Sequence, residues 1–172
     1  LVSEPLARLG AKVTGLDAAA ETLEAARLHA EESGLEIRYR HGSAEDLAGE
    51  GRRFDAVLAL EIVEHVADVE AFLGAAASLV KPGGALVLST LNRTPKSFLM
   101  AVVGAEYVLR WLPRGTHDWR RFLKPSEVTR MLRDGGLDVQ DAAGLAYNPV
   151  ADTWRLAPHD LDVNYLLFAV RQ

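Results

Sequence analysis

Short apolar runs alternate with segments of helical character along most of the chain. Three of the runs are nearly continuous in apolar residues, as in strands that are covered on both faces of a sheet. The runs predict strands over 12–17, 37–40, 54–60, 85–90, 137–145 and 163–170. Helical spacing or composition predicts helices over 2–9, 20–33, 69–80, 97–112 and 126–133. Helices placed between short buried strands indicate a parallel sheet wrapped by helices, so the fold class is α/β.

Polar and turn-forming residues set the expected boundaries of these elements. Asp68 and Ser126 are candidate N-caps, because their side-chain oxygens can accept hydrogen bonds from the first turn of a helix. Residues 41–46 read as a polar loop, and residues 81–84 contain a proline and paired glycines that close a helix. The last two strands are expected to be joined by a loop that contains Pro149 and Pro158.

The composition of the chain excludes several classes of protein. With 172 residues and 18.7 kDa it fits a single domain over 1–172, and it contains no cysteine, which excludes disulfide frameworks and thiol nucleophiles. A net charge of −5 argues against a nucleic-acid partner, and nothing calls for an oxidising compartment, so a cytoplasmic location is expected. The opening residues, from Leu1, contain no signal peptide, and we expect that the native protein is longer.

One acidic residue ends the first apolar run. Asp17 lies at the carboxyl end of a predicted strand, where nucleotide-like ligands bind in open α/β sheets and an acid can accept both hydroxyls of a ribose. The alternative is that Asp17 is the N-cap of the next helix. Hydride transfer of the short-chain dehydrogenase type is unsupported, because none of the four tyrosines is followed by a lysine four residues later.

Two carboxylates and an imidazole follow the strand at 54–60. If the chain becomes helical directly after that strand, Glu61, Glu64 and His65 share one face at the spacing i, i+3, i+4. Such a set can chelate Mg, Mn or Zn. The alternative is that the acids favour a helix start through the helix dipole and that His65 only fills space.

Ordered motifs of the chain resemble a known family. The segments VTGLD (13–17), GSAED (42–46), FDAVLALE (54–61) and LVKPGG (79–84) resemble the class I methyltransferases that use S-adenosylmethionine (SAM). A second set resembles, more narrowly, the ubiquinone-biosynthesis O-methyltransferases: SEPLARLG (3–10), EIVEHV (61–66), STLNR (89–93), MAVVGAEY (100–107), GTHD (115–118) and DVNY (162–165). The resemblance covers essentially the whole chain.

The resemblance implies a Rossmann-like fold with a mostly parallel central sheet and helices on both faces. It makes Asp17 the acid at the ribose, places Ala44 and Glu45 beside the adenine, and lets Leu60 line the methionine end through its backbone. In this family a first strand and a glycine-rich loop precede the residues that match Leu1, and both are missing here. We therefore expect a gap in the sheet with unpaired backbone groups on both neighbouring strands.

The family implies methyl transfer to a polyprenylated phenol or catechol. A phenol oxygen is a poor nucleophile until it is deprotonated, and a metal bound by Glu61, Glu64 and His65 could lower its pKa. Without a metal, His65 could be the catalytic general base. The alternatives are a metal-independent small-molecule methyltransferase with a soluble substrate and a non-catalytic lipid-surface module.

An apolar and basic insertion occupies about 93–125. Residues 90–125 contain seven basic and two acidic residues, a net charge of +5, so the remainder of the chain carries −10. The helix expected at 97–112 is too short to span a bilayer. With the polyprenyl substrates that the family implies, residues 97–124 are expected to attach the protein to an anionic membrane surface at the inner face of the membrane. Packing on the sheet or in a homo-oligomer contact is the alternative.

Overall fold

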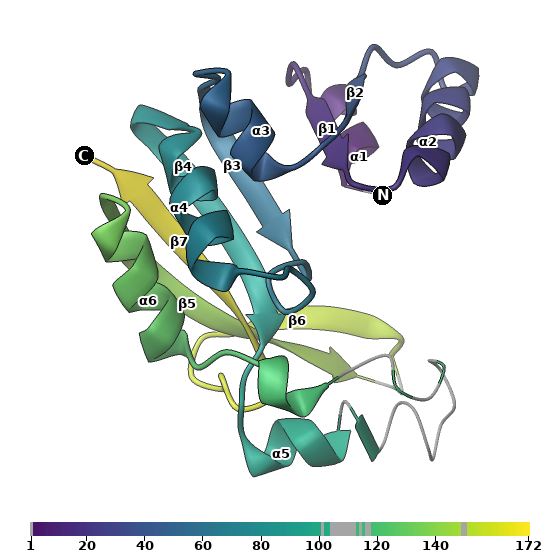
Figure 1. Cartoon of the computed structure of the whole chain (residues 1–172). Helices are drawn as coiled ribbons and strands as arrows, with labels where there is room; N and C mark the ends of the chain where they lie inside the picture. Colours follow the sequence, from purple (N-terminus) through teal and green to yellow (C-terminus); the bar gives the residue numbers. More distant parts are fainter. Residues whose placement is uncertain (1, 101, 104–112, 114, 116–117, 149–150) are drawn as a thin grey trace. The chain divides into compact units, whose positions relative to one another are not determined.

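The computed structural model describes residues 2–100, 102–103, 113, 115, 118–148 and 151–172 (Figure 1). The chain divides into two compact units, Leu1–Gly51 and Arg52–Gln172, and each is described by itself. The α/β class expected from the sequence is confirmed in both units, because parallel strands alternate with helices in each.

The first unit is a pair of parallel strands with three helices. Its elements are α1 (Ser3–Arg8), β1 (Thr14–Asp17), α2 (Ala20–Glu32), β2 (Arg38–His41) and α3 (Ala44–Gly49). β1 and β2 pair so that Asp17 lies opposite His41, which places the carboxyl ends of both strands at one edge. α2 ends where the sequence predicted, because Gly34 adopts a left-handed φ of 65° that stops a helix.

The second unit is a five-stranded sheet with the order β3-β4-β7-β5-β6. Its elements are β3 (Phe54–Leu60), α4 (Val69–Ser78), β4 (Val80–Leu91), α5 (Pro95–Ser97), the 3-10 turn η2 (Trp119–Arg121), α6 (Pro125–Asp134), β5 (Leu137–Asn148), β6 (Thr153–Ala157) and β7 (Asn164–Arg171). β3 and β4 are parallel, whereas β7 is antiparallel to β4 and β5. β1 and β3 each pair with one strand in the described residues, so each lies at an edge of its sheet. Ala59 is the one buried residue of β3, so the expectation that the strand at 54–60 is covered on both faces was wrong.

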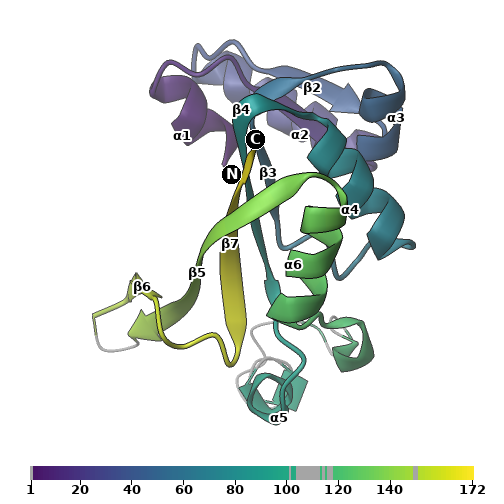
Figure 2. The same cartoon turned by 90° about the vertical axis from the view of Figure 1, so that its left-hand side faces the viewer.

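Helices α4 and α6 cover the same face of this sheet (Figure 2). Val128 and Leu132 of α6 and Leu73 of α4 are fully buried there, against alternate residues of the strands. At the far end of the helices, the Arg171 guanidinium donates to the carbonyls of Ala77 (3.1 Å) and Gly135 (2.9 Å), near the carboxyl ends of α4 and α6. A cation at two helix carboxyl ends is favoured by their dipoles.

Three predicted boundaries were wrong for local reasons. Residues 44–46 belong to α3 rather than to a loop, because Ser43 caps that helix. α6 begins at Pro125, since proline suits the first helical position, and Ser126 is therefore not the N-cap. β4 extends back to Val80, and the register with β3 jumps across residues 81–84, which form a bulge instead of a break.

The expected loop between the last strands was also wrong, because it contains β6. This strand pairs with the end of β5 through Gly144–Asn148 and Thr153–Ala157. Its burial is slight, so it has no continuous apolar signal in the sequence. Most of the helix expected at 97–112 lies outside the described residues.

Candidate active site

In the first unit, Asp17 ends β1 at the edge where β2 also ends. One carboxylate oxygen, Oδ1, accepts a hydrogen bond from the backbone N–H of Ala19 at 2.8 Å, and the Asp17 carbonyl accepts one from Gly42 at 3.1 Å. The N-cap of α2 is Ala19, without a side-chain bond, so the alternative that Asp17 is this N-cap was wrong. The Asp17 side chain instead shapes the turn between strand and helix.

Ala44 and Glu45 open α3 at the same edge of this unit. Ser43 is the N-cap: its hydroxyl accepts from the Asp46 N–H at 3.2 Å, and its own N–H donates to the Asp46 carboxylate at 2.8 Å. These bonds stabilise the charged form, so they hold the pKa of Asp46 below its usual value. Ala44 is buried and Glu45 is exposed. β1 and β2 are parallel, so their carboxyl ends lie at the same edge of the sheet. Asp17 ends β1 there, and α3 starts just after the end of β2. Nucleosides bind at this edge in open α/β sheets.

In the second unit, Leu60 ends β3 and Glu61 leaves it in an unusual conformation. Glu61 has a φ of 52°, in the left-handed region, and its N–H donates to the carbonyl of Ser89 at 3.1 Å. The Ser89 hydroxyl donates to Oε1 of Glu61 at 2.6 Å. The chain does not become helical here, since residues 61–68 form bends and turns and α4 starts at Val69. The expected helical face of Glu61, Glu64 and His65 was therefore wrong.

Glu64 and His65 lie close together at the edge where β3 and β4 end. Glu64 is only 4% exposed, and its Oε2 accepts a hydrogen bond from the Thr90 hydroxyl at 2.7 Å. Nε2 of His65 lies 4.0 Å from Oε1 of Glu64, and the imidazole is half exposed. This pairing gives a buried carboxylate beside an accessible imidazole, an arrangement that suits general acid–base chemistry.

Glu61 is separated from this pair by the pleat of β4. Neighbouring residues of a strand point to opposite faces, so Ser89 and Thr90 hold their glutamates on different faces of the sheet. Thr90 pairs with the buried Tyr165 on the face covered by α4 and α6. Within the described residues, no three histidine or acidic side chains are arranged to bind one metal ion. The residue types suit a divalent cation, but only Glu64 and His65 are adjacent.

Sequence reasoning missed Ser89 and Thr90. Both belong to the motif STLNR, which contributed to the resemblance but received no role of its own. The available signal was their position, since hydroxyls at the carboxyl end of a strand adjacent to the acids can donate to them.

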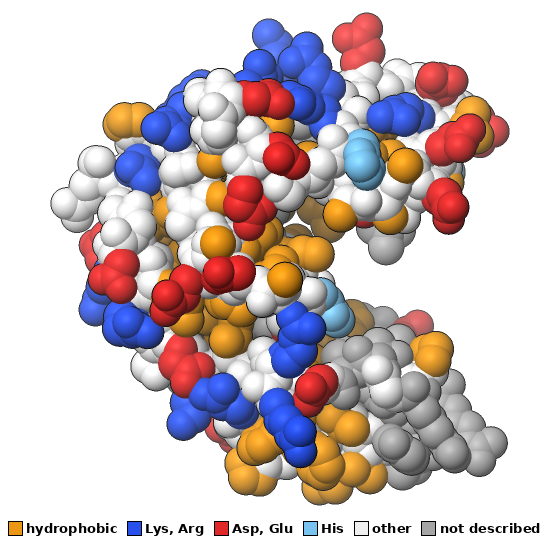
Figure 3. Space-filling view, in the orientation of Figure 1, with side chains coloured by type: hydrophobic (Ala, Val, Ile, Leu, Met, Phe, Trp, Pro, Cys, Tyr) orange, Lys and Arg blue, Asp and Glu red, His pale blue; other side chains and the backbone are white. Residues whose placement is uncertain are grey.

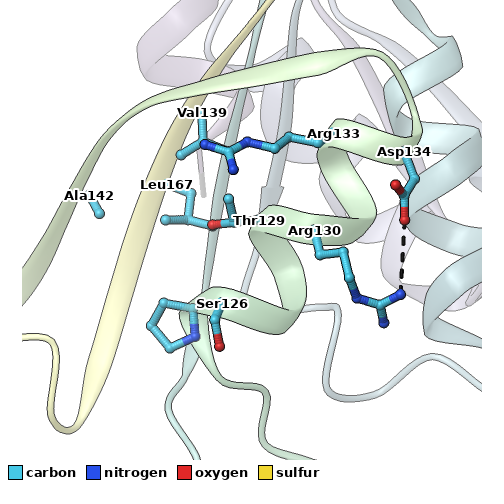
Figure 4. A pocket seen from close by; sticks show the side chains of 9 residues that line it. Ser126, Thr129, Arg130, Arg133, Asp134, Val139, Ala142 and Leu167 are labelled. Carbon is cyan, nitrogen blue, oxygen red and sulfur yellow. Dashed lines mark ion pairs between the residues drawn. The ribbon is translucent and has the colours of Figure 1, made fainter.

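A shallow depression of about 380 Å³ lies elsewhere, between α6 and strands β5 and β7 (Figure 4). It is mainly apolar, with Arg130 and Arg133 at its rim, and Arg130 forms an ion pair with Asp134. None of the predicted site residues lines it. The depression therefore takes no part in the candidate active site.

Comparisons with known proteins give a consistent family. The model of a family described as a methyltransferase domain matches residues 1–88. A protein of Dinoroseobacter shibae named ubiquinone biosynthesis O-methyltransferase is 57% identical over 171 residues, which are 99% of this chain and 69% of that protein. Proteins of the same name from Ruegeria pomeroyi and Paramagnetospirillum magneticum are 54% and 55% identical over 99% of this chain, covering 69% and 68% of theirs.

Solved structures show the same fold at low identity. Magnesium protoporphyrin IX methyltransferase from Synechocystis PCC 6803, solved with bound S-adenosylhomocysteine, has a TM-score of 0.72 and 21% identity, covering 99% of this chain and 69% of that one. A SAM-dependent methyltransferase from Methanosarcina mazei has a TM-score of 0.70 and 16% identity, covering 99% and 86%. These likenesses establish the architecture.

The matching methyltransferase-domain model, together with the fold, places the chain among the class I SAM-dependent methyltransferases. At 53–57% identity over nearly its whole length, the chain belongs to the ubiquinone biosynthesis O-methyltransferase family. The predictions of fold class, of an O-methyltransferase activity and of SAM as cofactor are therefore confirmed.

Proposed function

We propose that this protein transfers the methyl group of SAM to a hydroxyl of a polyprenylated phenol or catechol in ubiquinone biosynthesis. The observation that carries the proposal is the 57% identity over 99% of the chain to a relative of that name. The geometry supports it, because candidate cofactor residues follow strand ends in one unit and an acid beside an imidazole follows a strand end in the other.

For the cofactor, we assign Asp17 to the ribose hydroxyls, Ala44 and Glu45 to the adenine, and the Leu60 backbone to the methionine end. The turn from Asp17 to Ala19 fixes the Asp17 carboxylate through Oδ1, which limits the rotamer entropy lost when a ribose binds. Ala44 has a small side chain in the first turn of α3, so it adds no bulky group where a flat ring would bind.

For the reaction, we propose that the phenolic hydroxyl is deprotonated next to Glu64 and His65. The phenolate oxygen then attacks the SAM methyl carbon, a C–O bond forms, and the C–S bond breaks with its electron pair going to sulfur. Nε2 of His65 can take the proton as general base, because the imidazole is half exposed and lies beside the Glu64 carboxylate.

A divalent metal is the second form of this proposal, with Glu61, Glu64 and His65 as the ligands. When bound, the metal would lower the pKa of the phenol. Glu64 and His65 fit such a role as neighbours, whereas Glu61 would have to exchange its hydrogen bond from Ser89 for the metal.

The cofactor assignment is tested by calorimetric titration of SAM. We expect one binding site in the wild type and an affinity at least about tenfold weaker in Asp17→Asn, because a charged acceptor of two hydroxyls is lost. Asp55→Asn is the matched control. Asp55 lies at the start of β3, whereas Asp17 lies at the end of β1, and the Asp55 carboxylate pairs with Lys81. Wild-type binding by Asp17→Asn would remove the assignment, and no binding by the wild type would favour a non-catalytic module.

The two forms of the reaction are separated by a chelator. If a metal is required, EDTA abolishes turnover and added Mg, Mn or Zn restores it. If His65 is the general base without a metal, turnover persists in EDTA and His65→Ala lowers kcat by about a hundredfold. Ala substitution of His159, an exposed histidine of the same unit, is the control.

We also propose peripheral attachment to an anionic membrane through residues 97–124. The described start of this segment exposes Phe98, Leu99 and Met100, and Figure 3 shows hydrophobic side chains near lysines and arginines at the α5 end of the second unit. No helix in the described ranges is long and apolar enough to cross a bilayer. Within this segment, residues 101, 104–112, 114 and 116–117 lie outside the described residues.

A further inference from the structure

The loop that carries the reaction residues has no regular secondary structure of its own. It runs from Glu61 to Asp68, and within it the His65 N–H donates to the carbonyl of Ile62 at 2.9 Å. Two side chains of β4 hold it from outside: Ser89 binds Glu61 and Thr90 binds Glu64. Both contacts act on the glutamates and neither acts on the chain after His65.

A third contact holds that later part of the loop. Nη2 of Arg121 donates a hydrogen bond to the backbone carbonyl of Val66, the residue that follows His65. Arg121 ends the 3-10 turn η2, in which its N–H donates to the Asp118 carbonyl at 2.9 Å and Oδ1 of Asp118 accepts from the Arg120 N–H at 3.0 Å. The Arg121 side chain therefore extends from a turn whose backbone is fixed by its own hydrogen bonds.

This turn is fixed to the same strand that holds the glutamates. Phe122 and Leu123 follow it and are buried, and the Leu123 N–H donates to the carbonyl of Leu91, at the end of β4, at 3.2 Å. The hydroxyl of Tyr165 donates to the Leu123 carbonyl at 2.9 Å, and Nε1 of Trp119 donates to the Thr94 carbonyl at 2.9 Å. Ser89, Thr90 and Arg121 thus act from one rigid base at the end of β4.

We propose that Arg121 is a positioning residue for His65, acting through the Val66 carbonyl. With the loop held on both sides of His65, the imidazole stays at the Glu64 carboxylate instead of sampling the conformations open to an irregular loop. A charged donor on a carbonyl is stronger than a neutral one, and a guanidinium gives it a fixed direction. The consequence for the reaction rests on the proposed function, but the effect on the loop does not.

The test compares Arg121→Ala with Arg120→Ala, because Arg120 has the same charge and lies in the same turn. Hydrogen exchange of the amides in 61–68 is the readout that does not depend on activity. We expect the exchange of the His65 and Val66 amides to be about tenfold faster in Arg121→Ala and unchanged in Arg120→Ala, since a charge-assisted hydrogen bond is lost in only one of them.

The kinetic arm uses the same variants with a soluble phenolic acceptor and no vesicles, so that membrane attachment through residues 97–124 does not enter the comparison. Arg121→Ala is expected to lower kcat by about tenfold, as losses of supporting contacts around reactive groups do, while the SAM affinity stays at the wild-type value. Arg121→Lys keeps a donor and is expected to recover part of kcat, whereas Arg120→Ala keeps all of it.

Equal exchange of 61–68 in the two alanine variants would overturn the proposal whatever the acceptor is. Faster exchange with an unchanged kcat would also overturn it, because the contact would then be structural only. An equal loss of kcat in both variants would assign the effect to charge at the surface. Failure of the proposed function is distinguishable, since wild-type protein would then lack turnover while the exchange difference persisted.

Discussion

At the scale of single residues, the candidate site depends on two adjacent hydroxyls. Ser89 and Thr90 follow each other in β4, so the pleat directs them to opposite faces and each engages a different glutamate. This places Glu64 beside His65 and keeps Glu61 away from them. The spacing Glu-x-x-Glu-His predicted the participants, but the donors that separate them lie far away in the sequence.

Acid titration of Asp46 is predicted from its hydrogen bonds. The Ser43 N–H and hydroxyl lower the pKa of Asp46, so this carboxylate stabilises the fold above its unfolded pKa of about 4. That contribution is lost as the pH falls from there through the folded pKa. In Ser43→Ala we expect the pKa of Asp46, measured by NMR titration of the side-chain carboxyl, to rise part of the way to its usual value.

Part of the shift should remain, because the backbone N–H of residue 43 is kept in the variant. Ser33→Ala is the matched control, since Ser33 is the C-cap of α2 and does not contact Asp46 in the described structure. A pKa of Asp46 that stays at its wild-type value in Ser43→Ala would show that the hydroxyl contributes nothing.

At the scale of elements, boundaries follow from capping and from close backbone approach. The start of α3 at Ala44 and of α6 at Pro125 are fixed by local chemistry that the sequence contains. The bulge at residues 81–84 has another cause, because it lets β4 pair with β3 on both sides of a tight backbone contact. Gly84 is required there because the backbone of a neighbouring strand leaves no room for a side chain, and the local sequence does not show this.

Two glycine substitutions separate these causes. A Cβ added at Gly84 would lie 2.8 Å from the Asp55 carbonyl oxygen and 2.9 Å from that of Lys81, and these backbone atoms cannot rotate away. We expect Gly84→Ala to lower the free energy of unfolding by about 1–3 kcal/mol, as overpacking does. Gly74→Ala is the control in α4, where a Cβ meets nothing within 4 Å, and it should raise stability by up to about 1 kcal/mol.

Urea unfolding of both variants measures these changes. Equal stability of Gly84→Ala and wild type would mean that the bulge relaxes around the new methyl group. A loss in Gly74→Ala would contradict the open surroundings of that position in α4.

At the scale of the whole molecule, the distribution of charged and apolar residues along the chain supports the proposed attachment to an anionic membrane. The segment 90–125 carries a net charge of +5 on a chain of net charge −5, and its described beginning exposes large apolar side chains. Basic residues near an anionic bilayer each contribute to binding, and inserted apolar residues add to it. The expectation of one domain over 1–172 stays a prediction.

Deletion of residues 98–112 tests the attachment. We expect the wild-type protein to sediment with anionic vesicles, more weakly at high salt, and the deletion variant to stay in the supernatant. Zwitterionic vesicles are the control for the electrostatic part. The SAM affinity of the variant should remain near the wild-type value, and unchanged sedimentation would remove membrane attachment through this segment.

The sequence by itself determined the alternation of strands and helices and the acids at strand ends. The apolar run 54–60 predicted β3 with the bounds that the structure has, although Ala59 is the one buried residue of that strand, and the motifs around Asp17 and Glu61 indicated the family. These features are local, because the composition and spacing of a segment are properties of its own residues.

Only the tertiary structure decided which groups meet. β6 has little burial of its own and exists because β5 offers it hydrogen-bond partners. The separation of Glu61 from His65 depends on β4, and the support of Val66 depends on Arg121, 55 residues away. Such contacts require distant residues to meet in the folded chain, and the free energy that fixes them is gained in the packing around β4.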